Sequence, residues 1–87
     1  MRARVQPDIA SVRQESQLVL LSMSKGRYYQ LNDVGGRIWE LLCEEASLGE
    51  IATTLQAEYA APPDVVESDV DRLVNQLQAA GLVALVE

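Results

Sequence analysis

The stretch "GRYYQLNDVGGRIWELL", residues 26–42, changes its periodicity in the middle. Its first part is rich in aromatic residues and is typical of a short β-strand. Side chains alternate between the two faces of a strand, so Tyr29 and Leu31 share one face while Tyr28 and Gln30 share the other. Only one of these pairs can point into the core of a small domain, and the sequence leaves open which pair does so.

The second part of the stretch predicts a helix that begins at Asn32, a residue type that caps helix N-termini. Gly35 and Gly36 are poor helix formers. In the first turn they favour a close approach of the helix to the sheet over phosphate binding, because the rest of a P-loop motif is missing. The expected apolar stripe consists of Val34, Ile38, Leu41 and Leu42, with Trp39 at its margin.

Upstream of this corner, short apolar runs are separated by the polar turns "RQESQ" and "MSKG". This pattern predicts a three-stranded antiparallel meander with strands at about residues 9–13, 17–22 and 27–31. The middle strand has apolar side chains on both faces, which predicts a central strand covered on both sides. The third strand is then an edge strand.

Two more helices are predicted downstream. Ser47 and Glu50 in "SLGE" form a capping-box sequence at the start of the second helix. The prolines of "AAPPD" end that helix, and a third helix runs from near Asp64 to Ala80, where Gly81 stops it. The apolar face of the second helix comprises Leu48, Ile51, Ala52, Leu55 and Tyr59.

The third helix has a core stripe and a mixed flank. On a helical wheel, Val65, Asp69, Arg72 and Gln76 lie just beside the stripe. An apolar residue among polar ones is typical of a groove wall, although a frayed first turn would explain Val65 nearly as well. After Gly81, "LVALVE" predicts a short strand or an extended tail against the core, which could also pair with another copy of the chain. The stripe comprises Val66, Val70, Leu73, Val74, Leu77 and Ala80.

Length and composition predict a single domain over residues 1–87. Such a short chain can build only one modest core, and 48% of its residues are hydrophobic. No apolar run reaches the roughly 20 residues that span a bilayer, and the N-terminus lacks a signal-peptide pattern, so we expect a cytoplasmic protein without a membrane partner. The lone cysteine, Cys43, lies in the apolar run "IWELLC" and is expected to be buried.

Charge and residue types argue against several functions. Residues 38–87 hold ten acidic residues and one basic residue, Arg72, so a DNA-binding role for the third helix would meet repulsion from the phosphates. The chain has no histidine and no second cysteine, which argues against a hydrolase or peptidase. An acyl carrier would share the size and acidity, but "ASLG" lacks the preceding aspartate of the carrier motif. We therefore expect a protein without enzymatic activity or a cofactor. An acyl carrier and a DNA-binding winged helix remain the alternative functions.

The predicted elements form an α+β domain that is winged helix-turn-helix-like: an N-terminal three-stranded antiparallel meander followed by three helices. Three pieces in this order, "GRYYQLNDVGGRIWELL", "SLGEIATTLQAEYA" and "DVDRLVNQLQAAGLV", resemble the PqqD-like proteins. These are recognition elements of pathways that modify ribosomally made peptides. The resemblance covers about residues 9–83, and at this size the chain is similar to the standalone recognition protein of lasso-peptide systems.

The resemblance implies a non-catalytic protein that binds the leader segment of a precursor peptide and presents the peptide to a separate cysteine protease and a cyclase. It also implies that the leader adds as a strand to the third strand and packs against the third helix. The strand "YYQ" suits this role, because it carries neither a charge nor a proline that would blunt its edge.

The site positions implied by the resemblance lie on these two elements. On the strand they are Arg27, Tyr28, Tyr29, Gln30 and Leu31, and on the helix they are Val65, Val66, Asp69, Val70, Arg72, Leu73 and Gln76. A candidate contact for the protease is the outer side of the first helix, where Arg37, Trp39 and Glu40 are expected to be exposed.

Overall fold

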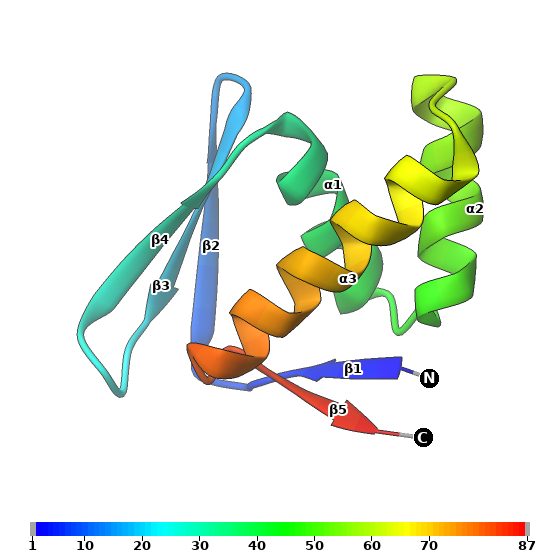
Figure 1. Ribbon diagram of the computed structural model, residues 1–87. Coiled ribbons are helices and arrows are strands. Elements are labelled where there is room, and N and C mark those ends of the chain that lie inside the picture. The colour runs from blue at the N-terminus through cyan, green and yellow to red at the C-terminus, as the bar shows by residue number, and fades with distance from the viewer. Residues whose placement is uncertain (1, 87) are drawn as a thin grey trace.

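A computed structural model describes residues 2–86 and shows a small sheet packed beside three helices (Figure 1). Strands β2, β3 and β4 form one antiparallel sheet in that order, and β1 pairs with β5 in a second sheet. The predicted α+β class, the meander and the edge position of β4 are confirmed. The elements are β1 (Arg2–Val5), β2 (Ile9–Gln14), β3 (Gln17–Ser22), β4 (Arg27–Leu31), α1 (Asp33–Cys43), α2 (Leu48–Tyr59), α3 (Pro63–Ala79) and β5 (Val83–Val86).

The sequence did not predict β1. This strand runs antiparallel to β5, with Arg2 opposite Val86 and Val5 opposite Val83. Its four residues include two arginines, so it has no apolar run that would mark it as a strand, although Ala3 between them is buried. Residues 83–86 of the segment "LVALVE" thus form a strand, and β1 is its partner.

Within residues 2–86, the three-stranded sheet is covered on one face only. Leu18 and Leu20 of β3 point into the core, whereas Leu21 on the opposite face is 43% exposed. Figure 1 shows α1 and α3 on the same side of the sheet. The prediction that the central strand is covered on both sides is therefore wrong, because the three helices pack against one another and against a single sheet face.

Helix α1 packs closely against the sheet at its first turn. The side chain of Asn32 accepts a hydrogen bond from the Gly35 N–H at 2.7 Å, which confirms the predicted cap. A Cβ atom on Gly36 would lie 3.2 Å from Cβ of Leu18, and one on Gly35 would lie 3.4 Å from Cβ of Leu31. The glycine pair therefore permits the predicted close approach of helix and sheet.

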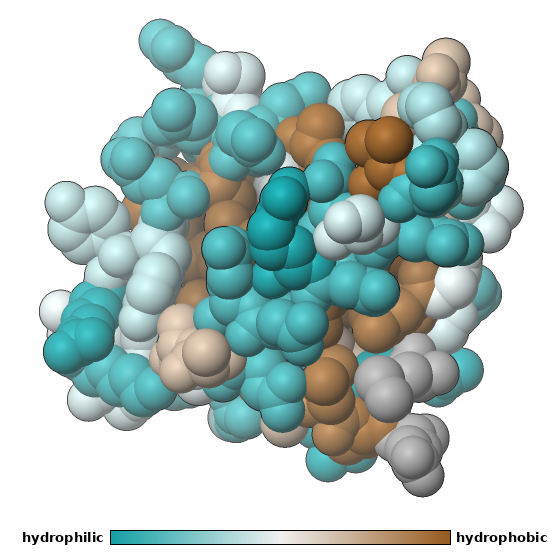
Figure 2. Space-filling view, viewed as in Figure 1, coloured by the Kyte–Doolittle hydropathy of each residue, from teal (hydrophilic) through white to brown (hydrophobic). Residues whose placement is uncertain are grey.

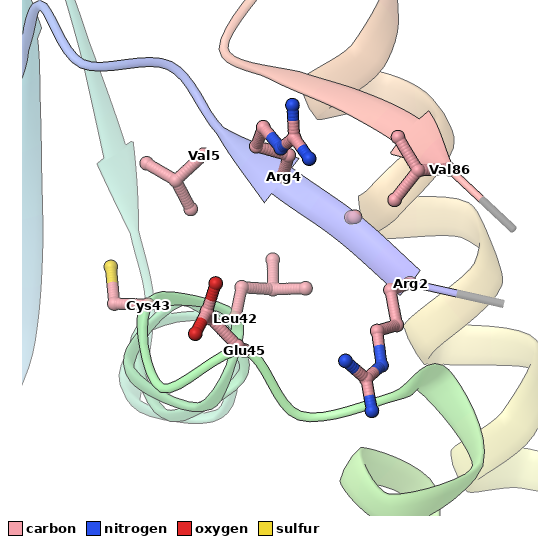
Figure 3. A pocket seen from close by; sticks show the side chains of 8 residues that line it. Arg2, Arg4, Val5, Leu42, Cys43, Glu45 and Val86 are labelled. Carbon is pink, nitrogen blue, oxygen red and sulfur yellow. The ribbon is translucent and has the colours of Figure 1, made fainter.

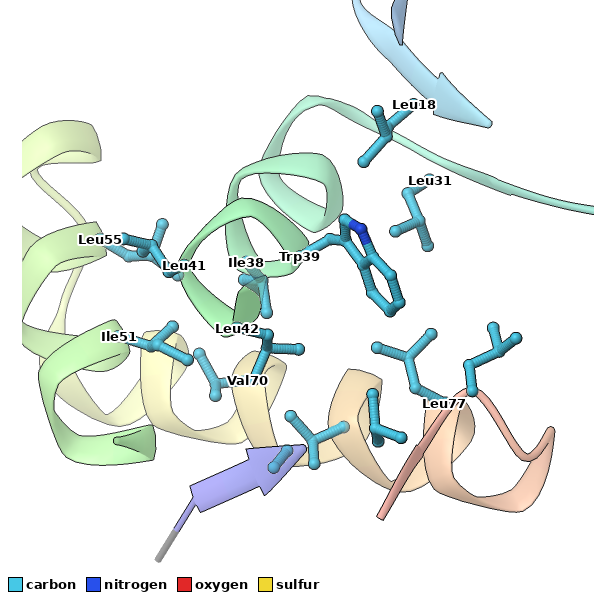
Figure 4. Close-up of a cluster of buried hydrophobic side chains, with 14 of the residues drawn as sticks. Leu18, Leu31, Ile38, Trp39, Leu41, Leu42, Ile51, Leu55, Val70 and Leu77 are labelled. Atoms are coloured by element: carbon cyan, nitrogen blue, oxygen red, sulfur yellow. The ribbon is translucent and has the colours of Figure 1, made fainter. Parts of the chain in front are cut away.

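The core lies between the inner face of the sheet and the three helices (Figure 4). Trp39 is only 2% exposed, so the expectation that it lies at the margin of the α1 stripe and is exposed is wrong. Figure 4 shows its ring directed toward Leu31 and Leu77, which cover the side of α1 that an isolated helical wheel leaves open. Cys43 shows the opposite error: it was expected to be buried but is exposed in the last turn of α1, beyond this cover.

Helices α2 and α3 start as the sequence predicts. The Ser47 N–H donates to Glu50 Oε1 at 2.8 Å and the Glu50 N–H donates to Ser47 Oγ at 3.1 Å, which confirms the capping box. Helix α3 begins at Pro63, where a missing N–H costs no helical hydrogen bond. No helix within residues 2–86 is long and apolar enough to cross a membrane. The buried residues of α3 are Val66, Val70, Val74 and Leu77.

Candidate functional site

A groove of about 370 Å³ lies between the end of β4 and the flank of α3. Three elements build it: β4 forms one wall and α3 forms the other. The floor consists of the first turns of α1 together with Leu31 of β4 and Leu73 of α3. Figure 2 shows hydrophobic surface as a strip between the β4 side of the molecule and the hydrophilic exposed face of α3. The lining residues are Gln30, Leu31, Asn32, Val34, Gly35, Ile38, Asp69, Arg72, Leu73 and Gln76.

The floor of the groove is apolar. Ile38 is 2% exposed and Leu31 is 9% exposed, while Val34 and Leu73 are half-buried. A Cβ atom on Gly35 would lie 3.6 Å from Cδ2 of Leu73, so glycine at this position leaves room above the floor. Such a floor gains free energy by covering an apolar side chain of a ligand.

The α3 wall is polar and carries both signs of charge. Arg72 Nη2 donates to Asp69 Oδ1 at 2.7 Å, and the two side chains are 68% and 42% exposed. Gln76 continues this wall one turn later, and Gln30 stands on the β4 side. The wall can therefore donate and accept hydrogen bonds next to an apolar floor.

The outer edge of β4 is open. Within residues 2–86, no strand pairs with the side of β4 that faces away from β3. The turn between β2 and β3 has two residues and leaves Gln14 opposite Gln17. Such turns close on a hydrogen-bonded pair, and bonded and non-bonded pairs then alternate along an antiparallel sheet. By this alternation, we infer that the backbone N–H and C=O groups of Tyr28 and Gln30 point to the open edge.

Half of the predicted site residues line this groove. The register of β3 and β4 puts Tyr29 and Leu31 on the inner face and Tyr28, which is 68% exposed, on the outer face. The pair that points into the core is therefore Tyr29 and Leu31. Arg27 is exposed at the start of β4. The predicted residues that line the groove are Gln30, Leu31, Asp69, Arg72, Leu73 and Gln76.

Three predicted residues of α3 lie outside the groove lining. Val66 and Val70 are 5% and 1% exposed, so they belong to the core and can affect a ligand only by supporting the wall. Val65 is 48% exposed in the first turns of α3 but does not line the groove. The helical wheel placed Val65 on the correct flank, but it gives no position along the helix axis relative to β4.

Four lining residues were not predicted as site residues. The sequence assigned Asn32 to a helix cap, Gly35 to helix–sheet packing, and Val34 and Ile38 to the core stripe of α1. The structure also places each of them in the groove lining, because the strand-to-helix corner turns the start of α1 under the groove. The signal was the glycine pair, which marks where the backbone approaches other elements closely.

A second cavity, of about 410 Å³, lies between β1 and the end of α1 (Figure 3). Arg2, Arg4, Cys43 and Glu45 are among its lining residues. Desolvation raises the pKa of the Cys43 thiol, and the carboxylates of Glu40 and Glu44 raise it further. The thiol therefore stays protonated near neutral pH, and the chain has no histidine to activate it. This cavity lacks the groups that acyl-transfer chemistry needs.

Comparison with known proteins identifies a matching family and two similar solved structures. The family described as "Coenzyme PQQ synthesis protein D (PqqD)" matches residues 17–83. A solved structure of TbiB1 in complex with the TbiA(beta) leader peptide is 30% identical, with a TM-score of 0.89, and the match covers 97% of this chain and 98% of that one.

A second solved structure, a lasso peptide synthetase B1 complexed with the leader peptide, is 29% identical, with a TM-score of 0.87 and coverage of 98% and 100%. A search of curated proteins found no match. The family match spans β3 to the start of β5 and includes both walls of the groove. This chain is a member of the PqqD family.

Proposed function

We propose that this protein binds the leader segment of a ribosomally made precursor peptide in lasso-peptide maturation, by strand addition to β4. The observation that carries the proposal is the open edge of β4 beside an apolar-floored groove. Both similar structures are complexes with a leader peptide, which supports the same role for this chain. An extended peptide gains affinity from ladder hydrogen bonds and selectivity from pockets for alternate side chains.

A strand added to β4 would direct every second side chain into the groove. These side chains would cover Leu31 and Leu73 on the floor, while polar neighbours would meet Asp69 and Arg72 on the wall. Arg27, Tyr28 and Tyr29 would take part through the strand backbone, and the buried valines of α3 would hold the wall in place. We expect a dissociation constant between about nanomolar and micromolar.

We further propose that the whole of residues 1–87 acts as one leader-binding domain in the cytoplasm without catalysis of its own. The cleavage and ring-closing steps would belong to a separate cysteine protease and a cyclase. By holding the leader, the protein would raise the local concentration of the precursor at these enzymes. The protonated Cys43 thiol is consistent with a binding role.

The outer face of the sheet is the surface that we propose for the protease. Its eight side chains are all uncharged, although 23% of the chain is charged, and the apolar ones Val12, Leu21 and Tyr28 are 57%, 43% and 68% exposed. Exposed apolar faces of this kind mark protein–protein contacts. A leader strand on β4 would widen this same face. The eight residues are Ala10, Val12, Gln14, Gln17, Val19, Leu21, Tyr28 and Gln30.

The outer side of α1, the earlier candidate for this contact, is less suitable. Trp39 is buried, and the charged side chains on that side are engaged in ion pairs within the molecule. Glu40 pairs with Arg13 at 2.6 Å, and Arg37 pairs with Glu58 at 2.8 Å. A partner would have to replace these ion pairs, whereas the outer sheet face can be covered without any such loss.

An amide-shift titration tests the leader site. The probe is the TbiA(beta) leader peptide, which is bound in one of the similar structures. Large shifts are expected at residues 28–31 and 69–76, and small ones in α2, because strand addition perturbs β4 and groove packing perturbs α3. Shifts centred on Ser47 and α2 would contradict strand addition.

A cleavage assay tests the division of labour. The protein alone should leave the precursor intact, and it should accelerate cleavage by the partner protease. Leu21→Asp should remove most of this acceleration while the leader affinity stays within about twofold, because a charge on the outer face opposes burial of that face. Cleavage by the purified protein alone, with trace protease excluded, would refute the non-catalytic role.

A further inference from the structure

A lysine in the turn between β3 and β4 contacts the end of α3. Lys25 Nζ donates to the backbone carbonyl oxygen of Ala80 at 2.7 Å. Ala80 is the C-cap of α3, and the last turn of this helix holds no basic residue. A cation at this end of a helix satisfies a free carbonyl and interacts favourably with the helix dipole. Lys25 is also the only lysine in the chain.

Gly81 makes room for this ammonium group. It has φ of +78°, and the Lys25 side chain occupies the place where a Cβ atom on Gly81 would lie. The left-handed backbone and the missing side chain at Gly81 together leave the Ala80 carbonyl accessible. The end of α3 is therefore shaped to receive a side chain from the sheet.

The turn that carries Lys25 is itself held in place. Ser24 contacts the Asp8 carboxylate through both its hydroxyl group and its backbone N–H, and the Met23 N–H donates to the Asp8 carbonyl oxygen at 3.1 Å. The Ser24 hydroxyl lowers the pKa of Asp8, so this carboxylate is ionised at neutral pH. Lys25 thus extends from a fixed turn.

The Lys25 contact lies on the same two elements as the groove, toward the opposite end. The groove joins the end of β4, at Gln30 and Leu31, to the middle of α3. Lys25 precedes the start of β4 by two residues and reaches the residue that follows α3. β4 and α3 are therefore linked at one end and separated by the groove at the other.

We propose that Lys25 is a positioning residue for the leader groove: its bond to Ala80 fixes the separation of β4 and α3, so that the groove is formed before the peptide arrives. This inference rests on the proposed function for its consequence in binding. The groove geometry itself can be measured without any ligand. If the link is lost, the competent separation is populated for only part of the time, and the apparent affinity falls by that fraction.

The first arm of the test measures the groove without peptide. Spin labels at Tyr28→Cys and Asn75→Cys, in a Cys43→Ser background, report the distance between β4 and α3 from positions outside the groove lining. Lys25→Met should broaden this distance distribution, and Lys25→Arg, which keeps the charge, should leave it close to that of the parent protein. Equal distributions in all three proteins would overturn the proposal.

The second arm measures binding of fluorescein-labelled TbiA(beta) leader peptide. Lys25→Met should weaken binding by roughly threefold to tenfold, and Lys25→Arg should restore it to within about twofold. Ser47→Ala removes the α2 capping box and serves as a control for lost stability; its affinity should not change. If Ser47→Ala weakens binding as much as Lys25→Met at a similar loss of thermal stability, the effect is only structural and the proposal fails.

Chemical modification of the single lysine sharpens this arm. Acetylation removes the charge of Lys25 and should mimic Lys25→Met, whereas reductive dimethylation keeps the charge and should not. Acetylated Lys25→Arg protein controls for the terminal amine. If the parent protein does not bind the peptide but Lys25→Met still broadens the distance distribution, the positioning role holds and the proposed function is at fault.

Discussion

The two edges of the three-stranded sheet, β4 and β2, each border a helix, but they differ in what lies between strand and helix. Beside β4 the space toward α3 is an open groove; among residues 2–86 its one ion pair, Asp69 with Arg72, stays within α3. Beside β2 the space toward α1 is spanned by an ion pair from Arg13 to Glu40 at 2.6 Å. A strand could be added to β4 without breaking a contact between elements.

A network of ion pairs links β2, α1 and α2 on the β2 side of the sheet. Glu40 also pairs with Arg37 at 3.5 Å, and Arg37 binds Glu58 of α2 through both carboxylate oxygens. Arg13 covers the first turn of α1, where a Cβ atom on Gly36 would lie 3.5 Å from its Nη2 atom. Charged residues on edge strands are a common protection against unwanted pairing. Among residues 2–86, an ion pair joins β2 to α1, whereas none joins β4 to α3 across the groove.

The largest expected effect separates the two edges directly. Gln30→Pro should weaken leader binding by about a hundredfold or more, because proline removes an N–H donor that we infer to face the open edge and its ring obstructs the added strand. The domain should stay folded, since that donor is not needed by β3. Fluorescence anisotropy of a labelled leader peptide measures the affinity, and thermal unfolding measures the stability.

The matched control places the same change on the other edge. Ser11 is exposed on β2, and by the same alternation its N–H faces away from β3. Ser11→Pro should therefore leave leader affinity within about twofold. Equal losses of leader affinity in the two proline variants would mean that the leader does not bind preferentially at β4, and would contradict strand addition at that edge.

A smaller effect is expected on the α3 wall. Asp69→Lys places a second cation beside Arg72 and should weaken leader binding by about tenfold, a loss of about 1.4 kcal/mol. Asp71→Lys makes the same change in charge on the same helix, away from the groove, and should have little effect. Glu58 is a poorer control because it is bound to Arg37. Isothermal titration of each variant checks the difference, and similar losses at both aspartates would count against the groove.

Local signals predicted most of the fold. The alternation in β4, the Asn32 cap, the capping box at Ser47 and the glycine pair each depend on residues close together in sequence, and the structure has them where expected. By contrast, β1 is a strand only because β5, from the other end of the chain, pairs with it. No pattern within its four residues carries that information.

The wrong predictions of burial for Trp39 and Cys43 also arise because burial depends on elements that are distant in sequence. A helical wheel ranks positions on one helix, but Trp39 is buried by β4 and α3 together, and Cys43 is exposed because nothing described packs over the last turn of α1 on that side. The site shows this limit as well. The flank of α3 was predicted, whereas the floor residues Val34 and Ile38 could be recognised only once β4 and α3 were placed beside them.

Removing the ion pair at β2 should have a modest effect of a different kind. Arg13→Ala breaks an ion pair with Glu40 that is 40% exposed on both sides, so the loss of stability should not exceed about 1 kcal/mol. Leader affinity should stay the same, but self-association should increase because an uncovered edge strand can pair with another copy. Sedimentation velocity at increasing concentration measures this.

Arg72→Ala is the counterpart on the β4 side, since it also removes an exposed ion pair. This variant should lower leader affinity without changing self-association. If Arg13→Ala instead gains a second leader site on β2, the ion pair is the main feature that distinguishes the edges. If neither variant changes anything, the ion pairs do not decide which edge binds.

The smallest expected effect is the response of the β2 side to acid. The hydrogen bond from Arg37 lowers the pKa of Glu58 below its ordinary value of 4.5. A carboxyl group whose pKa is lower in the folded protein contributes stability above its unfolded pKa and loses it as the pH falls through the folded pKa. The gap in melting temperature between the parent protein and Glu58→Gln should therefore be present at neutral pH and should shrink below about pH 4.5. A gap that stays constant down to about pH 2.5 would show that the Glu58 charge adds nothing, and the protection of the β2 side would then depend on Arg13 and Glu40.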